Sequence, residues 1–233
     1  YPRSLLNFRG ALLNALIAKG YEVHVAAPKL AEDSEFGVEL VSMGLHVHEL
    51  SIARGGLNPL IDFVTLCKLW LLMRRIKPDV TLSYTIKPVI YGGIASWLAG
   101  VPNRFALITG LGYAFTDDGR SRIFVRWIVQ KLYRLGLSKT QKVFFQNPDD
   151  KRLFYTLKIV QKSKNKTCLV NGSGVDLDKF IRAPFPRTIK FLMIARLLGD
   201  KGIREFVQSA KLVRRRFPEV KFGVTGGGFL CCR

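Results

Sequence analysis

The chain has 233 residues, and 48% of them are hydrophobic, so it can bury a core and does not belong to the intrinsically disordered class. It carries 37 Lys and Arg against 17 Asp and Glu, which gives a formal net charge of +20. This balance favours polyanionic partners, namely nucleic acid, anionic lipid or phosphorylated ligands.

The first 170 residues alternate short apolar runs with longer segments whose apolar residues recur at helical spacing. Helices are predicted at 5–17, after 28 to about 43, at 59–76, 89–98 and 122–135, and from 147 onward. Strands are predicted at 21–27, 45–50, 79–83, 105–108, 142–145 and 167–170. Alternation at this pitch predicts βαβ units and an α/β fold with a doubly wound parallel sheet.

A segment rich in Gly, Pro and Asp, residues 171–186, interrupts this pattern and is predicted to be a linker. The alternation then restarts with a strand at 189–195, a helix at 203–213 and a strand at 220–225. We therefore expect a first domain over residues 1–183 and the first βαβ unit of a second Rossmann-like domain over 187–233. Because the chain opens on a helix at a residue other than Met and stops soon after a strand, we expect both ends to be truncated.

Basic residues cluster in two stretches that lack acidic residues, 119–148 and 151–175. They suit either a solvated basic face or contact with anionic phospholipid, where each Lys or Arg contributes about 1 kcal/mol. No nucleic-acid-binding motif accompanies them, so nucleic acid is not expected as a partner. The most apolar run, 60–73, contains Asp62 and Lys68 and is shorter than the roughly 20 residues that span a bilayer. We expect a chain that does not cross the membrane.

The strongest local signal for chemistry is the strand FLMIA at 191–195, which is followed by Arg196 and, at the start of the next helix, Lys201. Ligands of open α/β sheets bind outside the carboxyl ends of strands, and helix N-termini attract phosphate. An Arg fork and a Lys point charge at this place can clamp a diphosphate. The alternative is a surface Arg and Lys that cap a strand edge.

Four further residues follow predicted strands or lie in the first helix. Gly110 and Gly112 come after the strand at 105–108 and either let a ligand approach the backbone or form a plain turn. Lys87 follows the strand at 79–83 and either contacts a phosphate or lies on the surface at a helix start. Arg9 either binds in a cleft or is an ordinary helix charge.

No metal site is predicted. His24, His46 and His48 do not cluster with acidic residues at metal-binding spacing, and His46 and His48 are expected on a half-exposed strand face. The four cysteines show neither zinc-finger spacing nor a disulfide framework, which is compatible with a reducing compartment. The glycines at 226–228 lack the Lys that a P-loop requires.

Several motifs resemble those of the GT-B glycosyltransferases of family 4, and the resemblance covers almost the whole chain. They are NFRG at 7–10, LNP at 57–59, RFALITGLG at 104–112 and VNGSGVDLDKF at 170–180. The first three are similar to a bacterial subgroup that adds a hexose or N-acetylhexosamine to polyprenyl-diphosphate-linked saccharides. The resemblance implies a GT-B N-terminal acceptor-binding domain over 1–183 and the start of a nucleotide-sugar donor domain over 187–233.

The resemblance also implies a retaining, metal-independent transfer from a UDP-sugar, without a cofactor, in the synthesis of a cell-surface polysaccharide or glycan. Arg196 and Lys201 fall on the family's donor-diphosphate pair. The segment that joins the two domains corresponds to Asn171, Gly172, Ser173 and Gly174. A peripheral enzyme on the cytoplasmic face of the cell membrane is implied, which gives the basic stretches a role. In the helix from Arg122, we expect the apolar residues to pack and the charges to contact lipid.

The sequence departs from the family pattern at several points. The first strand with its glycine-rich turn and most of the donor domain, including an acidic Glu-x7-Glu segment, are absent. Many relatives carry a His where this chain has Ile86, so no catalytic base is assigned. The alternative reading is therefore an inactive fragment that only binds anionic membrane or acceptor. A dinucleotide-dependent oxidoreductase fits the fold but lacks the GxGxxG fingerprint.

Overall fold

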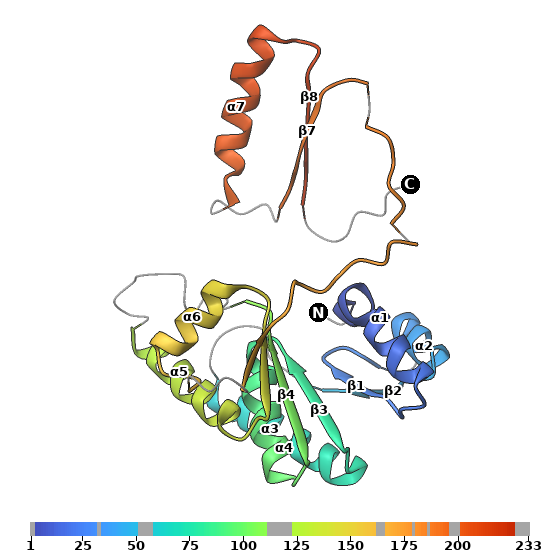
Figure 1. Cartoon of the computed structure of the whole chain (residues 1–233), viewed down its shortest axis with the longest axis vertical. Coiled ribbons are helices and arrows are strands. Elements are labelled where there is room, and N and C mark those ends of the chain that lie inside the picture. The colour runs from blue at the N-terminus through green and yellow to red at the C-terminus, as the bar shows by residue number, and fades with distance from the viewer. Residues whose placement is uncertain are drawn as a thin grey trace. The chain divides into compact units, whose positions relative to one another are not determined.

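The computed structural model describes residues 3–31, 34–50, 58–110, 123–161, 166–178, 180–185, 187–195 and 201–226. The chain divides into two compact units, Tyr1–Asp176 and Leu177–Arg233, and each is described by itself (Figure 1). The assignment of acceptor binding to residues 1–183 and of donor binding to 187–233 stays a prediction.

Unit 1 alternates helices and strands as the sequence pattern predicts. Its elements are α1 (Ser4–Ala18), β1 (His24–Ala27), α2 (Glu35–Ser42), β2 (His46–Glu49), α3 (Pro59–Ile76), β3 (Val80–Tyr84), η1 (Pro88–Gly92), α4 (Gly93–Leu98), β4 (Asn103–Ile108), α5 (Ile123–Ser138), β5 (Lys142–Phe145), α6 (Pro148–Thr156) and β6 (Thr167–Leu169). The side chains of Ser34, Asn58 and Asn147 accept hydrogen bonds from backbone N–H groups in the first turns of α2, α3 and α6. Such N-caps satisfy donors that the helix itself leaves open, and they fix where each helix begins.

Every strand pair in unit 1 is parallel, which confirms the predicted α/β class. The strands form two hydrogen-bonded sheets, with the orders β1-β2 and β3-β4-β5-β6, rather than the single sheet expected.

Two apolar cores hold unit 1 together. One packs α1 and α2 against β1 and β2, with Leu13, Val25, Leu40 and Val47 buried. The other joins α3, η1, α4, α5 and α6 to the four-stranded sheet, with Phe154 fully buried. Figure 1 shows α1 and α2 beside β1 and β2, and α3 and α4 beside β3 and β4.

The helix predicted at 89–98 begins as the π-helical turn η1 and continues as α4. Here the chain passes very close to α5. A Cβ atom at Gly136 would lie 2.7 Å from the carbonyl oxygen of Ile90, and one at Gly93 would meet the carbonyl oxygen of Gly136. The missing side chains of Gly93 and Gly136 therefore allow this backbone contact.

In its described residues, unit 2 is a single βαβ unit, as predicted, formed by β7 (Lys190–Ile194), α7 (Ile203–Arg216) and β8 (Lys221–Thr225). β7 and β8 pair in parallel, and the rings of Phe191 and Phe222 stack at 5.1 Å. None of the residues of α7 is buried, because two strands and one helix enclose little volume.

Candidate functional site

Three polar residues and a glycine of unit 1 lie where the strands end. Tyr84 is the last residue of β3, Gly110 follows β4, Gln146 follows β5 and Ser173 follows β6. Because all pairs are parallel, the carboxyl ends of these four strands lie at one edge of the sheet. Open α/β sheets bind ligands at this edge.

Arg9, on α1, is the most buried cation at this edge, with 8% of its surface exposed. Its Nη1 donates hydrogen bonds of 2.9 Å to Ser173 Oγ and to the backbone oxygen of Phe8. Its guanidinium carbon lies 5.1 Å from the centre of the Tyr84 ring, within the range of a cation–π interaction. Burial lowers the pKa of Arg9, and the charge of Tyr84 partly opposes this shift.

The Arg9 Nε–H is buried and finds no hydrogen-bond acceptor among the described residues. A buried unpaired donor is rare in folded proteins, and it costs about 1–3 kcal/mol. The guanidinium therefore holds one donor, the Nε–H, that the described residues leave unsatisfied.

The segment after β6 is tied to the same place through Ser173. Its Oγ also accepts a hydrogen bond of 3.1 Å from Gln146 Nε2. Gly172 and Gly174 have φ values of +76° and +75°, which glycine adopts without strain. The structure thus brings together two features that the sequence pointed to separately, Arg9 and the segment 171–174. Gln146 carried no signal in the sequence.

Lys87 lies just after β3, and its ammonium group is paired with a carboxylate of α3. Its Nζ forms an ion pair of 2.7 Å with Asp62 Oδ1 of α3, and the two side chains are 14% and 6% exposed. Burial, and then the hydrogen bond and negative charge of Asp62, raise the pKa of the neighbouring Tyr91. Lys87 therefore neutralises a buried carboxylate. In the sequence, Asp62 stands out only as an interruption of an apolar run.

The structure describes only some of the remaining predicted site residues. Gly110 has a φ of +145°, and a Cβ there would meet no atom of the described residues within 4 Å. Lys201 is exposed and precedes α7 by two residues. Arg196 and Gly112 lie outside the described residues. The Arg196–Lys201 clamp stays a prediction.

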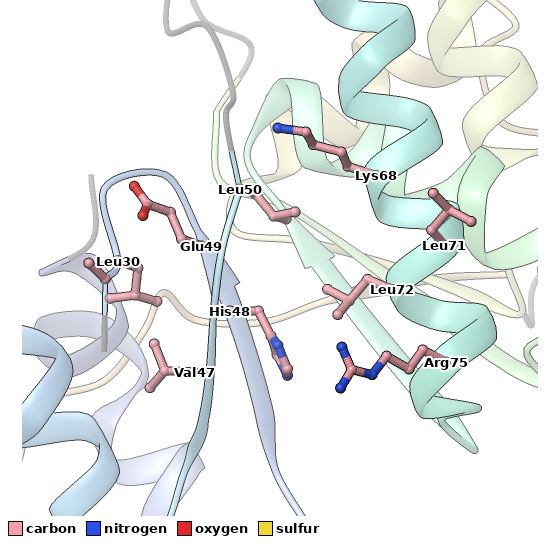
Figure 2. Close-up of a pocket in the computed structure, with 10 residues that line it drawn as sticks. Leu30, Val47, His48, Glu49, Leu50, Lys68, Leu71, Leu72 and Arg75 are labelled. Atoms are coloured by element: carbon pink, nitrogen blue, oxygen red, sulfur yellow. The ribbon is translucent and has the colours of Figure 1, made fainter. Parts of the chain in front are cut away.

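An open pocket of about 760 Å³ lies between the end of β2 and α3. Figure 2 shows His48 of β2 and Arg75 of α3 pointing toward one another across it. Lys68 and Glu49 also line it, whereas none of the predicted site residues does. The pocket therefore offers mixed charges but lacks the buried hydrogen-bonding groups found around Arg9.

The prediction that the histidines do not cluster with acidic residues is wrong. Glu22, His24 and His46 place one potential metal-ligand atom each within 4.8 Å of one another. The parallel register sets His24 directly opposite His46, which sequence spacing cannot show. The signal for this cluster in the sequence was the two-residue spacing of Glu22 and His24, and of His46 and His48.

The expected packing of the apolar residues of α5 is also wrong for its first turns. Val129, Tyr133 and Leu137 face the core, whereas Phe124 and Trp127 are 68% and 54% exposed. Phe124 and Trp127 precede the part of α5 that faces the core, and Lys131 Nζ lies 5.5 Å from the centre of the Trp127 ring.

In the described parts of the chain, no helix has the length and apolar character needed to cross a bilayer.

The parallel strands and interleaved helices define a Rossmann-like α/β protein. A family model described as glycosyl transferase 4-like matches residues 6–147, which is more than half of the chain. The chain therefore belongs to the glycosyl transferase 4-like family, as its motifs indicated.

Two enzymes are similar to this chain in sequence. One is N,N'-diacetylbacillosaminyl-diphospho-undecaprenol α-1,3-N-acetylgalactosaminyltransferase of Campylobacter jejuni, 28% identical over 96% of this chain and 61% of its own length. The other is the UDP-Gal:α-D-GlcNAc-diphosphoundecaprenol α-1,3-galactosyltransferase of Escherichia coli, 26% identical over 72% of this chain and 46% of its own length. The chain thus spans about half to three fifths of these relatives.

Among solved structures, UDP-GlcNAc 2-epimerase from Neisseria meningitidis bound to UDP-GlcNAc matches with a TM-score of 0.62. The match covers 97% of this chain and 63% of that protein, at 13% identity. At this identity the likeness supports the fold alone.

The Asp62–Lys87 pair generates a prediction about stability. Lys87→Met should lower the free energy of unfolding by about 3–5 kcal/mol, because it leaves the Asp62 carboxylate buried without its cation. Urea denaturation measures this change. The double variant Asp62→Leu/Lys87→Met should be more stable than Lys87→Met, and exposed Lys68→Met on α3 serves as the control. A loss in Lys87→Met no larger than in Lys68→Met would show that the pair is not structural.

Proposed function

We propose that the protein is a glycosyltransferase that transfers a sugar from a UDP-sugar to a polyprenyl-diphosphate-linked saccharide in the synthesis of a cell-surface glycan. The observation that carries the proposal is the sequence match over 96% of this chain to a transferase whose name specifies a diphospho-undecaprenol acceptor. The family match supports the same reaction class.

In this reaction the bond between the sugar's C1 and the UDP oxygen breaks, and a bond from C1 to an acceptor hydroxyl oxygen forms. Negative charge develops on the departing diphosphate, and fixed cations stabilise that transition state. Arg196 and Lys201 are proposed to supply them. The departing phosphate oxygen accepts the proton of the acceptor hydroxyl, so a retaining transfer needs neither a side-chain base nor a metal.

For the acceptor, the proposed contacts lie at the carboxyl edge of unit 1. Arg9 has a buried guanidinium with an unused Nε–H among the described residues, which suits a phosphate oxygen. Lys87 contributes less, because Asp62 already balances its charge. Gly110 and Gly112 would leave room for a ligand next to the backbone.

We also propose peripheral attachment to the cytoplasmic face of the membrane. Phe124 and Trp127 are exposed on the first turns of α5, and Lys131 lies beside Trp127. Exposed aromatic rings flanked by cations are typical of helices that lie in a membrane interface. The basic stretches add attraction to anionic lipid. Nucleic acid is not proposed as a partner.

The reaction is tested with the complete reading frame that contains this chain, by measuring UDP release from a panel of UDP-sugars with and without a polyprenyl-diphosphate saccharide. Release should depend on the acceptor. Arg196→Ala and Lys201→Ala should each lower kcat by about 100-fold or more, since removal of one charge-stabilising donor has an effect of this size.

Arg204→Ala, an exposed arginine in the first turn of α7, is the matched control and should retain activity. Acceptor-independent release, or none with any donor, would contradict the proposed reaction. Full activity of both clamp variants would contradict the site while leaving the reaction class intact.

Membrane attachment is tested by flotation with vesicles that contain anionic phospholipid. Phe124→Ala/Trp127→Ala should weaken binding by about tenfold or more, because burying such a side chain contributes about 1.5–3 kcal/mol and 1.4 kcal/mol corresponds to tenfold. Leu60→Ala/Phe63→Ala, which removes two exposed apolar side chains from α3, is the control. Equal binding by both double variants would rule out α5 as the attachment site.

A further inference from the structure

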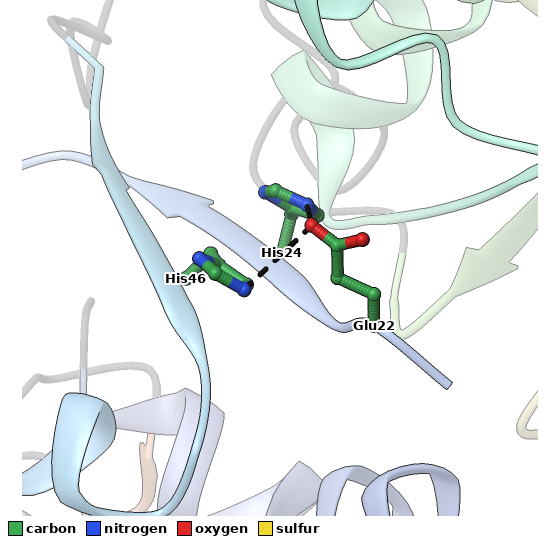
Figure 3. A group of neighbouring side chains, drawn as sticks. All are labelled: Glu22, His24 and His46. Atoms are coloured by element: carbon green, nitrogen blue, oxygen red, sulfur yellow. Dashed lines mark hydrogen bonds and ion pairs between the residues drawn. The ribbon is translucent and has the colours of Figure 1, made fainter. Parts of the chain in front are cut away.

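Three side chains at the amino ends of β1 and β2 have the composition and spacing of a transition-metal site. His24 Nε2 lies 2.9 Å from Glu22 Oε1, and His46 Nε2 lies 3.7 Å from the same oxygen. Figure 3 shows the carboxylate of Glu22 beside the two imidazole rings. Two imidazole nitrogens and one carboxylate oxygen form a common ligand set for Zn²⁺.

The parallel register of the two strands produces this arrangement. His24 pairs with His46, so both rings project from the same face, and they stack at 4.6 Å with 20° between their planes. Residues 22 and 24 are two positions apart, so the Glu22 side chain lies on the same face as His24. The cluster therefore depends on the pairing of the two backbones and on the conformations of exposed side chains.

Two of the three separations between ligand atoms suit a tetrahedral ion, once the His46 ring turns out of its stack with His24 so that both lone pairs converge. Zinc bonds of 2.0–2.2 Å at tetrahedral angles place ligand atoms about 3.3 Å apart. The observed separations of 2.9 Å and 3.7 Å lie on either side of this value. The side chains of Glu22 and His46 are 71% and 57% exposed, so both can rotate into position at low cost. Their exposure also leaves the fourth coordination position accessible to water.

His48 supplies an outer-shell contact of the kind that metal-binding histidines use. Its Nε2 lies 2.9 Å from His24 Nδ1, and the two rings stack at 5.2 Å. A hydrogen bond at Nδ1 orients the His24 ring with Nε2 directed to Glu22 and the ion. His24 is the least exposed of the three candidate ligands, at 22%, and anchors the site.

We propose that Glu22, His24 and His46 bind one Zn²⁺ ion, with water as the fourth ligand. The site lies at the amino ends of β1 and β2, whereas Arg9 and Ser173 lie at the carboxyl edge. The ion therefore has no part in sugar transfer. It links β1 to β2, which within the described residues hydrogen-bond only to each other as strands. The proposal is independent of the proposed function.

The test is a calorimetric titration of Zn²⁺ into chelator-treated protein that carries no histidine tag. Cys231→Ser/Cys232→Ser is the background, so that the adjacent thiols do not bind the ion. A single Zn²⁺ per chain should bind and raise the melting temperature. His46→Gln should weaken binding by about 100-fold or more, because loss of even an outer-shell partner costs 10- to 100-fold.

Glu22→Gln should also weaken binding, while Glu39→Gln, an exposed carboxylate on α2, should not. The ligands chosen for substitution are exposed, so the variants should fold, and circular dichroism checks this. Tetrahedral Co²⁺ absorption in the background protein, lost in His46→Gln, gives an independent readout. Absence of Zn²⁺ binding, or equal affinity in the background and His46→Gln, would overturn the proposal.

Discussion

Parallel strand pairing is the constraint on which the rest of unit 1 depends. It places the carboxyl ends of β3 to β6 at one edge, and there Arg9, Gln146 and Ser173 meet although they come from distant parts of the chain. The same pairing in β1 and β2 sets His24 beside His46 at the amino ends. One rule of backbone geometry thus produces two separate polar sites with different chemistry, one suited to an anion and the other to a cation.

At the carboxyl edge of unit 1, burial and hydrogen bonding distinguish Arg9 from Lys87. Arg9 lies on the first helix and Lys87 lies just after a strand. Lys87 Nζ is 2.7 Å from the buried carboxylate of Asp62. Arg9 faces a hydroxyl, a backbone oxygen and an aromatic ring rather than a carboxylate. A guanidinium held this way keeps its attraction for a phosphate group.

Much of the fold could be predicted from the sequence, because strand and helix periodicity and the caps at Ser34, Asn58 and Asn147 are local signals. Side-chain partners could not be predicted in this way. Arg9 and Ser173 are 164 positions apart, and Lys87 and Asp62 are 25 apart, so only the folded chain defines these pairs. The exposure of Phe124 likewise depends on which part of α5 meets the core. The family motifs indicated Arg9 and segment 171–174 but not the bond between them.

We propose that Arg9 holds a phosphate of the acceptor at the carboxyl edge of unit 1. The most direct measurement is calorimetric binding of a short-chain polyprenyl-diphosphate saccharide to the wild type, to Arg9→Gln and to Arg3→Gln, which alters an exposed arginine before α1. We predict that Arg9→Gln binds about tenfold or more weakly, since a hydrogen bond to a charged group contributes about 1.5–3 kcal/mol, while Arg3→Gln binds normally. Wild-type affinity in a folded Arg9→Gln variant would show that Arg9 does not hold the acceptor phosphate.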